Sequence, residues 1–461
     1  MAKKTLKALA ILSLLAFLNG TAMAANNATS TTTGANNLST ITQSGDGQTA
    51  DVTQNGDDND SNVDQSNLDN TATIGQDGDD NVSTSNQSGV GNSATVNQIM
   101  DDNASNVDQS GDGNVANVDQ DNNNQSSVNQ SGNGNDADVN QSGNAIGTNI
   151  DNISVIDQSG DDNIATVDQD DRNRSNVNQT GSGNIASVDQ TGFSGFDDNV
   201  SDVQQSGDDN NADVTQNGDL NNSRVNQEGD LNNATVAQSG TNNDSVVNQF
   251  GDDNFADVNQ TGTDNVSNVE QDELNDAVVD QSGDRNNADV NQNDVLATFD
   301  GSGGNSAAVT QSGDDNEATV NQFDPTDFGG SKGNTAIIDQ SGDFNQATVN
   351  QNNGSVVSNL NSFDNSADIE QSGDYNVATV SQDDDNTATV LQTGLGTAQT
   401  KNTVTITQHD DGDVADAEQH IGEGNTITID QEACCSGGGA NNFATAIQSG
   451  SFNTTTITQL P

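Results

Sequence analysis

The stretch QSGVGNSATVNQ, from Gln87 to Gln98, contains the pattern that decides the fold. Its two glutamines are 11 residues apart. Ala94, Val96 and Gln98 fall at alternate positions and would share one face of a β-strand, because side chains alternate along a strand. The residues between them are polar and would face water. The stretch therefore predicts one β-strand in each 11-residue unit.

The marker glutamine recurs along the chain in 35 units, most of them 11 residues apart, and seven spacings of 15 to 20 residues indicate loop insertions. Stacked amides can bond to their copies above and below, so we expect the markers to form a structural ladder. The markers chosen for this ladder are Gln54, Gln65, Gln76, Gln87, Gln98, Gln109, Gln120, Gln130 and Gln141.

Two further positions repeat with the marker. An asparagine stands six residues before it and is also expected to face inward and to join a ladder; these residues are Asn92, Asn103, Asn114 and Asn135. A glycine stands two residues after the marker and predicts a turn, because glycine adopts backbone angles that other residues avoid. The turn glycines are Gly89, Gly111, Gly132 and Gly181.

The residue four positions before the marker alternates between Ser and Ala, from Ser39 and Ala50 as far as Ser267 and Ala277. The true repeat is therefore two units, which indicates two non-equivalent strands per coil that face each other across a thin core. The 35 units would then form an all-β solenoid of about 17 two-stranded coils with amyloid-like stacking. One coil buries too little apolar surface to fold alone, so stability is expected to come from stacking.

The chain is expected to divide into four segments. Residues 1–24 predict a secretory signal, with Lys3, Lys4 and Lys7 before an apolar run that is too short to cross a membrane. Polar residues 25–38 precede the first unit. Residues 39–281 form the regular array. In residues 282–461 the Ser/Ala alternation lapses and loop insertions become frequent, so this part is expected to be less regular.

Composition excludes several classes of function. The chain has 9 Lys or Arg against 71 Asp or Glu, a formal net charge of −62, which disfavours binding to nucleic acid or anionic lipid. No later stretch is apolar enough to predict a membrane span. We find no Ser/His/Asp arrangement on a recognisable elbow and no phosphate-binding loop. The sequence therefore predicts no enzymatic activity and no cofactor.

The repeat resembles the curlin repeat of the bacterial curli major subunit, whose pattern is Q-x-G-x-G-N-x-A-x-x-x-Q. Besides the stretch that starts at Gln87, the segments QSGDGNVANVDQ from Gln109, QSGNGNDADVNQ from Gln130 and QTGSGNIASVDQ from Gln179 keep every fixed position. In many other units Asp replaces the second Gly. The serine that the family has ahead of the glutamine is usually Asn here. The resemblance covers residues 39–459.

The resemblance implies a structural subunit of an extracellular bacterial surface fibre, a functional amyloid of the fimbrium type that serves adhesion and the biofilm matrix. It implies self-association into fibres, with an outer-membrane secretion channel and a nucleator subunit as partners. It also implies that the glutamines and asparagines at the strand ends form stabilising ladders. Residues 25–38 look like the segment that is read during outer-membrane secretion.

Other functions remain open. Stacked acidic turns could bind Ca²⁺ through columns of carboxylates, although a solvated acidic edge is the favoured interpretation. A monomeric Ca²⁺-dependent solenoid adhesin or an ice-binding protein is therefore the alternative to a fibre subunit. An ice-binding protein would need a flat array of threonines, whereas the outward positions mix Thr with Asp and Asn.

Four more residues have chemistry of their own. His409 and His420 each follow a marker glutamine, and they are interpreted as surface residues because two histidines on opposite strands lack a third metal ligand. Cys434 and Cys435 are adjacent and could bridge each other only with strain. They are interpreted as a loop feature or an occasional link between chains, with a metal or redox role as the alternative. The sequence thus predicts no metal site.

Overall fold

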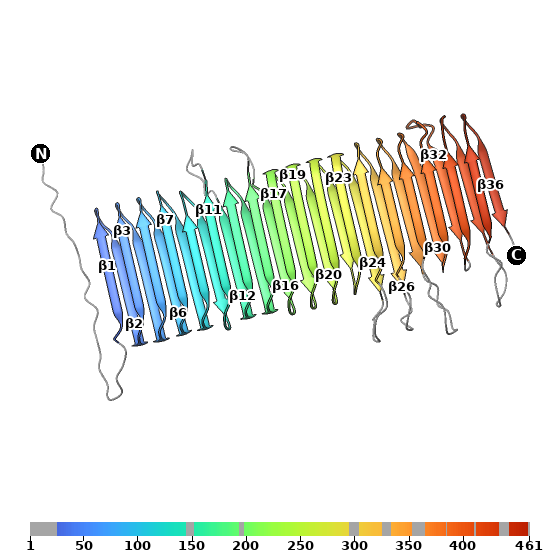
Figure 1. The fold of residues 1–461 in the computed structure, drawn as a ribbon. Coiled ribbons are helices and arrows are strands. Elements are labelled where there is room, and N and C mark those ends of the chain that lie inside the picture. Colours follow the sequence, from blue (N-terminus) through green and yellow to red (C-terminus); the bar gives the residue numbers. More distant parts are fainter. Residues whose placement is uncertain are drawn as a thin grey trace, which may run out of the picture. The chain divides into compact units, whose positions relative to one another are not determined.

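The computed structural model describes residues 25–143, 152–192, 198–294, 304–324, 333–352, 365–383, 385–409, 412–432 and 442–459. The expected signal and both cysteines lie outside these residues. All 36 regular elements in the described part of the chain are β-strands (Figure 1). They fall into two compact units, one up to Leu220 and the other from Asn221.

The first unit contains seventeen strands, which follow one another along the chain with short turns between most of them. They are β1 (Asn27–Thr33), β2 (Leu38–Asp46), β3 (Thr49–Asn55), β4 (Asp60–Leu68), β5 (Thr71–Asp77), β6 (Val82–Val90), β7 (Ser93–Ile99), β8 (Ala104–Asp112), β9 (Val115–Gln120), β10 (Gln125–Ser131), β11 (Asp136–Ser142), β12 (Ile153–Asp161), β13 (Ile164–Asp170), β14 (Arg174–Ser182), β15 (Ile185–Thr191), β16 (Val200–Ser206) and β17 (Asn211–Asp219).

The second unit contains nineteen strands, among which longer connections are more frequent. They are β18 (Asn222–Glu228), β19 (Asn233–Thr241), β20 (Asp244–Phe250), β21 (Phe255–Thr263), β22 (Val266–Gln271), β23 (Asp276–Asp284), β24 (Asn287–Asp294), β25 (Ser306–Ser312), β26 (Glu317–Asp324), β27 (Thr335–Gln340), β28 (Gln346–Asn352), β29 (Ser366–Gln371), β30 (Asn376–Asp383), β31 (Thr387–Gln392), β32 (Asn402–Gln408), β33 (Val414–Gln419), β34 (Thr426–Gln431), β35 (Phe443–Gln448) and β36 (Thr454–Gln459).

The strands of the first unit form two parallel sheets, one from the odd-numbered strands and one from the even-numbered strands. Each strand pairs with the strand two places further along the chain, and the register puts identical positions side by side. Ser39 lies beside Ser61 in the even sheet, and Ala50 lies beside Ala72 in the odd sheet. The two-strand coil predicted from the Ser/Ala alternation is therefore confirmed, as is the all-β solenoid.

The second unit has the same arrangement, with β18 to β36 in one sheet and β19 to β35 in the other. Here the alternation ends within a sheet, because β24 places Ala288 beside Ser267 of β22. The register continues through this change, so strand pairing does not require the serine. The division of the array at residue 281 stays a prediction.

Inward side chains are buried along both sheets. On β3, Ala50, Val52 and Gln54 are fully buried, whereas the residues between them are exposed. In most strands the buried set is one small residue, one branched apolar residue and one glutamine; β6 has Ser85 at the branched position. The core is therefore a set of columns in which each side chain contacts its own copy in the next coil.

One strand lies outside the expected array. β1 occupies part of the polar segment 25–38 and pairs with β3, where Thr32 aligns with Gln54. The marker pattern missed this strand because a threonine stands where the other strands have glutamine. That is why the described residues have one strand more than the 35 marked units. A role for this segment in secretion stays a prediction.

Candidate functional site: stacked ladders and open coil ends

The marker glutamines lie in columns linked by side-chain hydrogen bonds. In the odd sheet, Nε2 of Gln76 donates to Oε1 of Gln98 at 2.9 Å, and Nε2 of Gln98 donates to Oε1 of Gln120 at 3.0 Å. The second Nε2 proton of Gln98 goes to the carbonyl oxygen of Val82 at 2.9 Å. Each amide is thus bonded to the coil before it, to the coil after it and to the backbone.

All nine predicted glutamines occupy these two columns. The odd-sheet bonds run from Gln54 through Gln76, Gln98 and Gln120 to Gln141, and the even-sheet bonds run from Gln65 through Gln87 and Gln109 to Gln130. In each of these bonds the Nε2 donor lies in the N-terminal coil and the Oε1 acceptor lies in the C-terminal coil. The columns are therefore polar along the stack. Their contribution to stability stays a prediction.

The asparagines form a second kind of ladder, at the turn before each strand. The backbone N–H of Asn114 donates to Oδ1 of Asn92 at 2.9 Å, and Nδ2 of Asn92 donates to the carbonyl oxygen of Gly111 at 2.8 Å. The other two predicted asparagines make the same kinds of bond: Asn103 donates to Asn81 Oδ1, and Asn135 donates to Asn114 Oδ1 and to the Gly160 carbonyl. Each asparagine therefore ties a turn to its neighbouring coils.

The glycine after each marker lies where coils approach most closely. All four predicted turn glycines have positive φ: Gly89 at 114°, Gly111 at 101°, Gly132 at 107° and Gly181 at 113°. A Cβ added to Gly111 would lie 2.0 Å from the carbonyl oxygen of Gly132 in the next coil. Glycine is needed here for its backbone angles and also because the stacked backbone leaves no room for a side chain.

Acidic residues that recur in the turns at one-coil spacing have a structural role that the sequence interpretation missed. The backbone N–H of Asp57 donates to Oδ1 of Asp79 at 2.6 Å, and that of Asp79 donates to Oδ1 of Asp101 at 2.8 Å. In the second unit, the N–H of Asp314 donates to Oδ1 of Asp343 at 2.9 Å. Asp57, Asp79 and Asp101 are solvent-exposed, so the acidic edge faces water, as expected, and also makes these bonds. These carboxylates bind the backbone of the preceding coil.

At the first coil the ladders end, and some of their hydrogen-bonding groups have no partner among the described residues. Every residue of β1 is exposed. Gln43 donates to Gln65 at 2.9 Å, but its own Oε1 accepts no hydrogen bond from the described residues. The Oε1 atom of Gln54 is buried without a partner because Thr32 precedes it in the column. Gln54 lies on β3 beneath β1, so the acceptor that the first coil presents at its open face is Oε1 of Gln43.

The last coil presents the complementary groups. The inward residues of β36 are partly exposed, unlike those of the strands within the array. Gln459 Oε1 accepts from Gln431 at 2.8 Å, and Gln459 Nε2 donates to the carbonyl oxygen of Phe443 at 3.1 Å. One Nε2 proton of Gln459 is left for a further acceptor. The C-terminal coil therefore presents a donor.

Comparison with known proteins identifies the repeat. The curlin associated repeat matches residues 34–66, 69–99, 207–240, 224–251, 303–323 and 364–394. A search of curated proteins found no match. Within the described residues, no helix is long and apolar enough to cross a membrane. The matches fall in both units and coincide with the stacked strands, so the chain belongs to the curlin-repeat family.

Proposed function

We propose that this protein is the structural subunit of an extracellular, curli-like amyloid fibre that serves adhesion and the biofilm matrix on a bacterial surface. The family and the solenoid fold point to a structural rather than an enzymatic role. The observation that carries the proposal is the pair of uncapped coil ends with complementary hydrogen-bonding groups.

Addition of a second copy would extend the columns. If the last coil of one copy stacks on the first coil of the next, Nε2 of Gln459 meets Oε1 of Gln43, which repeats the bond seen between successive coils. An open strand edge is a template for another chain. A head-to-tail contact of this kind does not close on itself and therefore gives a filament.

The partners in the cell are part of the same proposal. Self-association follows from the ends, whereas the outer-membrane secretion channel and the nucleator subunit rest on the family resemblance alone. A signal sequence at residues 1–24 would bring the chain to that channel.

Electron microscopy of the purified full chain tests the proposal. After incubation in buffer we expect unbranched fibres that give a diffraction reflection at about 4.8 Å along the fibre axis. Chains that stay monomeric and folded would contradict it and would favour the alternative, a Ca²⁺-dependent adhesin or an ice-binding protein. Adding CaCl₂ to such monomers and measuring surface binding would separate those two.

A further inference from the structure

One group of side chains in the second unit lies outside the ladders and resembles a metal site. His409 follows β32 directly, and Asp430 and Glu432 lie on either side of the buried Gln431 at the end of β34. Gln408 pairs with Gln431 in the parallel register, so His409 is next to this strand end. Three potential ligands from two successive coils therefore meet on the outer face.

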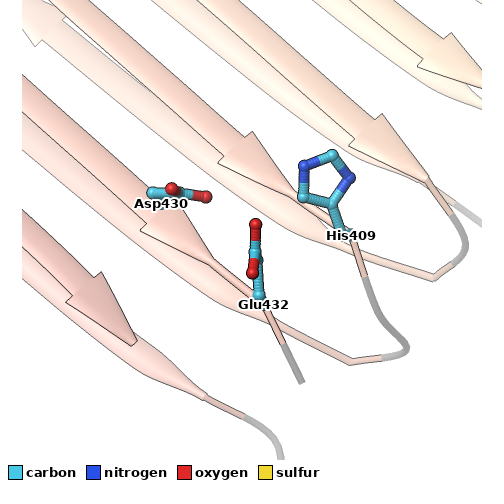
Figure 2. A group of neighbouring side chains, drawn as sticks. All are labelled: His409, Asp430 and Glu432. Atoms are coloured by element: carbon cyan, nitrogen blue, oxygen red, sulfur yellow. The ribbon is translucent and has the colours of Figure 1, made fainter. Parts of the chain in front are cut away.

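The distances suit a single ion. One ligand atom from each of His409, Asp430 and Glu432 lies within 4.8 Å of the other two. Figure 2 shows the imidazole with one ring nitrogen on the side that faces both carboxylates. A tetrahedral zinc ion bonds nitrogen and oxygen ligands at about 2.0–2.2 Å, so its ligand atoms stand about 3.3–3.6 Å apart. Small side-chain rotations at this surface bring the three atoms to that separation.

A fourth residue orients the imidazole. Nδ1 of His409 lies 3.2 Å from Oδ2 of Asp383, at the end of the preceding strand β30. Metal-bound histidines commonly donate their other ring N–H to a carboxylate, which fixes the tautomer and leaves Nε2 as the ligand. Asp383 therefore acts as a positioning residue, and it turns Nε2 toward Asp430 and Glu432.

The carboxylates of Asp430 and Glu432 have no hydrogen-bond or ion-pair partner among the described residues. Together with Asp383 they put three negative charges around one imidazole. Like charges at this separation repel each other, and a divalent cation between them would reverse the sign of the interaction. The site therefore has both the geometry and the charge for a cation.

We propose that His409, Asp430 and Glu432 bind one Zn²⁺ ion, which joins the coils of β32 and β34 on the outer face of the solenoid. Three protein ligands and one open position are a common arrangement for zinc, and an imidazole favours zinc over the hard cations Ca²⁺ and Mg²⁺. The open position would hold water or a ligand from a second molecule. The sequence interpretation was that the two histidines lack a third ligand. At His409, Asp430 and Glu432 of the next coil supply the missing ligands.

The chain contains a matched control. His420 follows a marker glutamine in the other sheet, and its Nε2 lies 3.0 Å from Oε2 of Glu418 on its own strand. Gln419 pairs with Gln448, so the next coil presents Ser449 beside His420 where the coil beside His409 presents Glu432. His420 thus has an acidic neighbour but no carboxylate from a second coil at the corresponding position.

Zinc binding to the full chain tests the proposal. ZnCl₂ is titrated in the presence of excess MgCl₂, which occupies weak carboxylate sites, and bound zinc is measured after equilibrium dialysis. We expect one retained Zn²⁺ per chain, loss of that ion in His409→Ala, retention in His420→Ala, and binding about tenfold weaker in Asp383→Asn. Equal binding by the two alanine variants would overturn the proposal.

A second measurement uses the unaltered protein. The chain has two histidines, so modification by diethylpyrocarbonate can be followed at each by mass spectrometry. Zn²⁺ should slow modification of His409 and leave the rate at His420 unchanged. Zinc binding that protects neither histidine would show that only the acidic surface binds the ion, and the proposal would be wrong.

Discussion

A single inward glutamine satisfies hydrogen bonds in three directions. Gln98 accepts from Gln76, donates to Gln120 and donates to the carbonyl oxygen of Val82. Because Gln98 is fully buried, water cannot replace any of these bonds. Loss of one side chain therefore leaves its neighbours as buried, unpaired polar groups, each costing about 1–3 kcal/mol.

Replacement of Gln98 by Leu should weaken the array locally. We expect amide hydrogen exchange in residues 76–120 to become about tenfold faster or more, since about 1.4 kcal/mol corresponds to a factor of ten. Asn97→Ala on the exposed face of the same strand is the control and should change exchange little. Similar exchange in the two variants would show that the amide column does not stabilise the stack.

The turn glycines can be tested at one turn. Gly111→Ala should destabilise the protein by about 1–3 kcal/mol, because the new Cβ meets the backbone of the next coil and φ is unfavourable. Gly113→Ala is matched to it: φ is 70° and a Cβ would meet nothing within 4 Å, so only about 1 kcal/mol is expected. The midpoint of urea unfolding, followed by circular dichroism, measures both. A larger effect at Gly113 would contradict the close coil approach.

At the scale of the strand, the two sheets differ in one inward position. The even strands of the first unit have serine there, and the hydroxyls of Ser154, Ser175 and Ser201 are buried without a hydrogen-bond partner among the described residues. The odd strands have alanine at the same position, for example Ala186. A buried hydroxyl without a partner is unfavourable. The serine column therefore lowers the stability of the sheet that contains it.

This difference predicts a stabilising substitution. Ser175→Ala should raise the free energy of unfolding by about 1 kcal/mol, because it removes an unpaired buried hydroxyl with almost no change in shape. Ser187→Ala, at an outward position of β15, removes the same atoms where water can solvate them and should have little effect. Destabilisation by Ser175→Ala in urea unfolding would show that the hydroxyl has a partner that matters.

Acidic residues along the strands make stability depend on pH. Desolvation, followed by the charges of Asp136, Asp119 and Asp168, raises the pKa of Asp138 above its usual value of 3.8. Desolvation also raises the pKa of Asp276 in the second unit. A raised folded-state pKa means that the folded protein binds more protons than the unfolded chain, so stability increases as pH falls through this range.

We therefore expect the melting temperature to rise as pH is lowered from 7 and to stop rising only below 3.8, the ordinary carboxyl pKa, where the unfolded chain also becomes protonated. Thermal unfolding at constant ionic strength measures this. The hydrogen bond from the Arg285 guanidinium holds the pKa of the Asp315 carboxyl below the usual range. This carboxyl therefore lowers the stability as pH falls, opposite to Asp138 and Asp276. A melting temperature that falls between pH 7 and 5 would contradict the expected dominance of the raised carboxylates.

The strands and their partners could be predicted from the sequence because the pattern that defines them is strict. The alternation of inward and outward residues predicts the strands. The Ser/Ala alternation between units predicts that each strand pairs with the strand two places further along the chain. What the pattern missed has a physical reason in each case. Strand β1 has Thr32 in place of the marker, and its pairing with β3 depends on backbone bonds that any residue can make.

The missed side-chain interactions all join different coils. The bond from the backbone of Asp57 to Asp79 depends on how closely the turns approach, which spacing alone does not reveal. The group formed by His409 and Glu432 arises from the register between β32 and β34. A search of the sequence for His, Asp and Glu residues one coil apart would have found the group of His409, Asp430 and Glu432.

For the whole molecule, the central claim is that contacts between copies repeat the contacts between coils. The net charge of −62 opposes assembly of like chains, so the attraction has to come from short-range bonds at the coil ends. Among the described residues, each hydrogen bond that joins two marker glutamines has its donor in the N-terminal coil and its acceptor in the C-terminal coil. A fibre built by these bonds must therefore be polar, with the last coil of one copy on the first coil of the next.

The most direct test is a cryo-electron microscopy structure of the fibre at side-chain resolution. The account predicts parallel strands that continue across the junction between copies at a rise of about 4.8 Å per coil, with Gln459 Nε2 within hydrogen-bond distance of Gln43 Oε1. A fibre in which copies pack side by side, with the first and last coils apart, would contradict it.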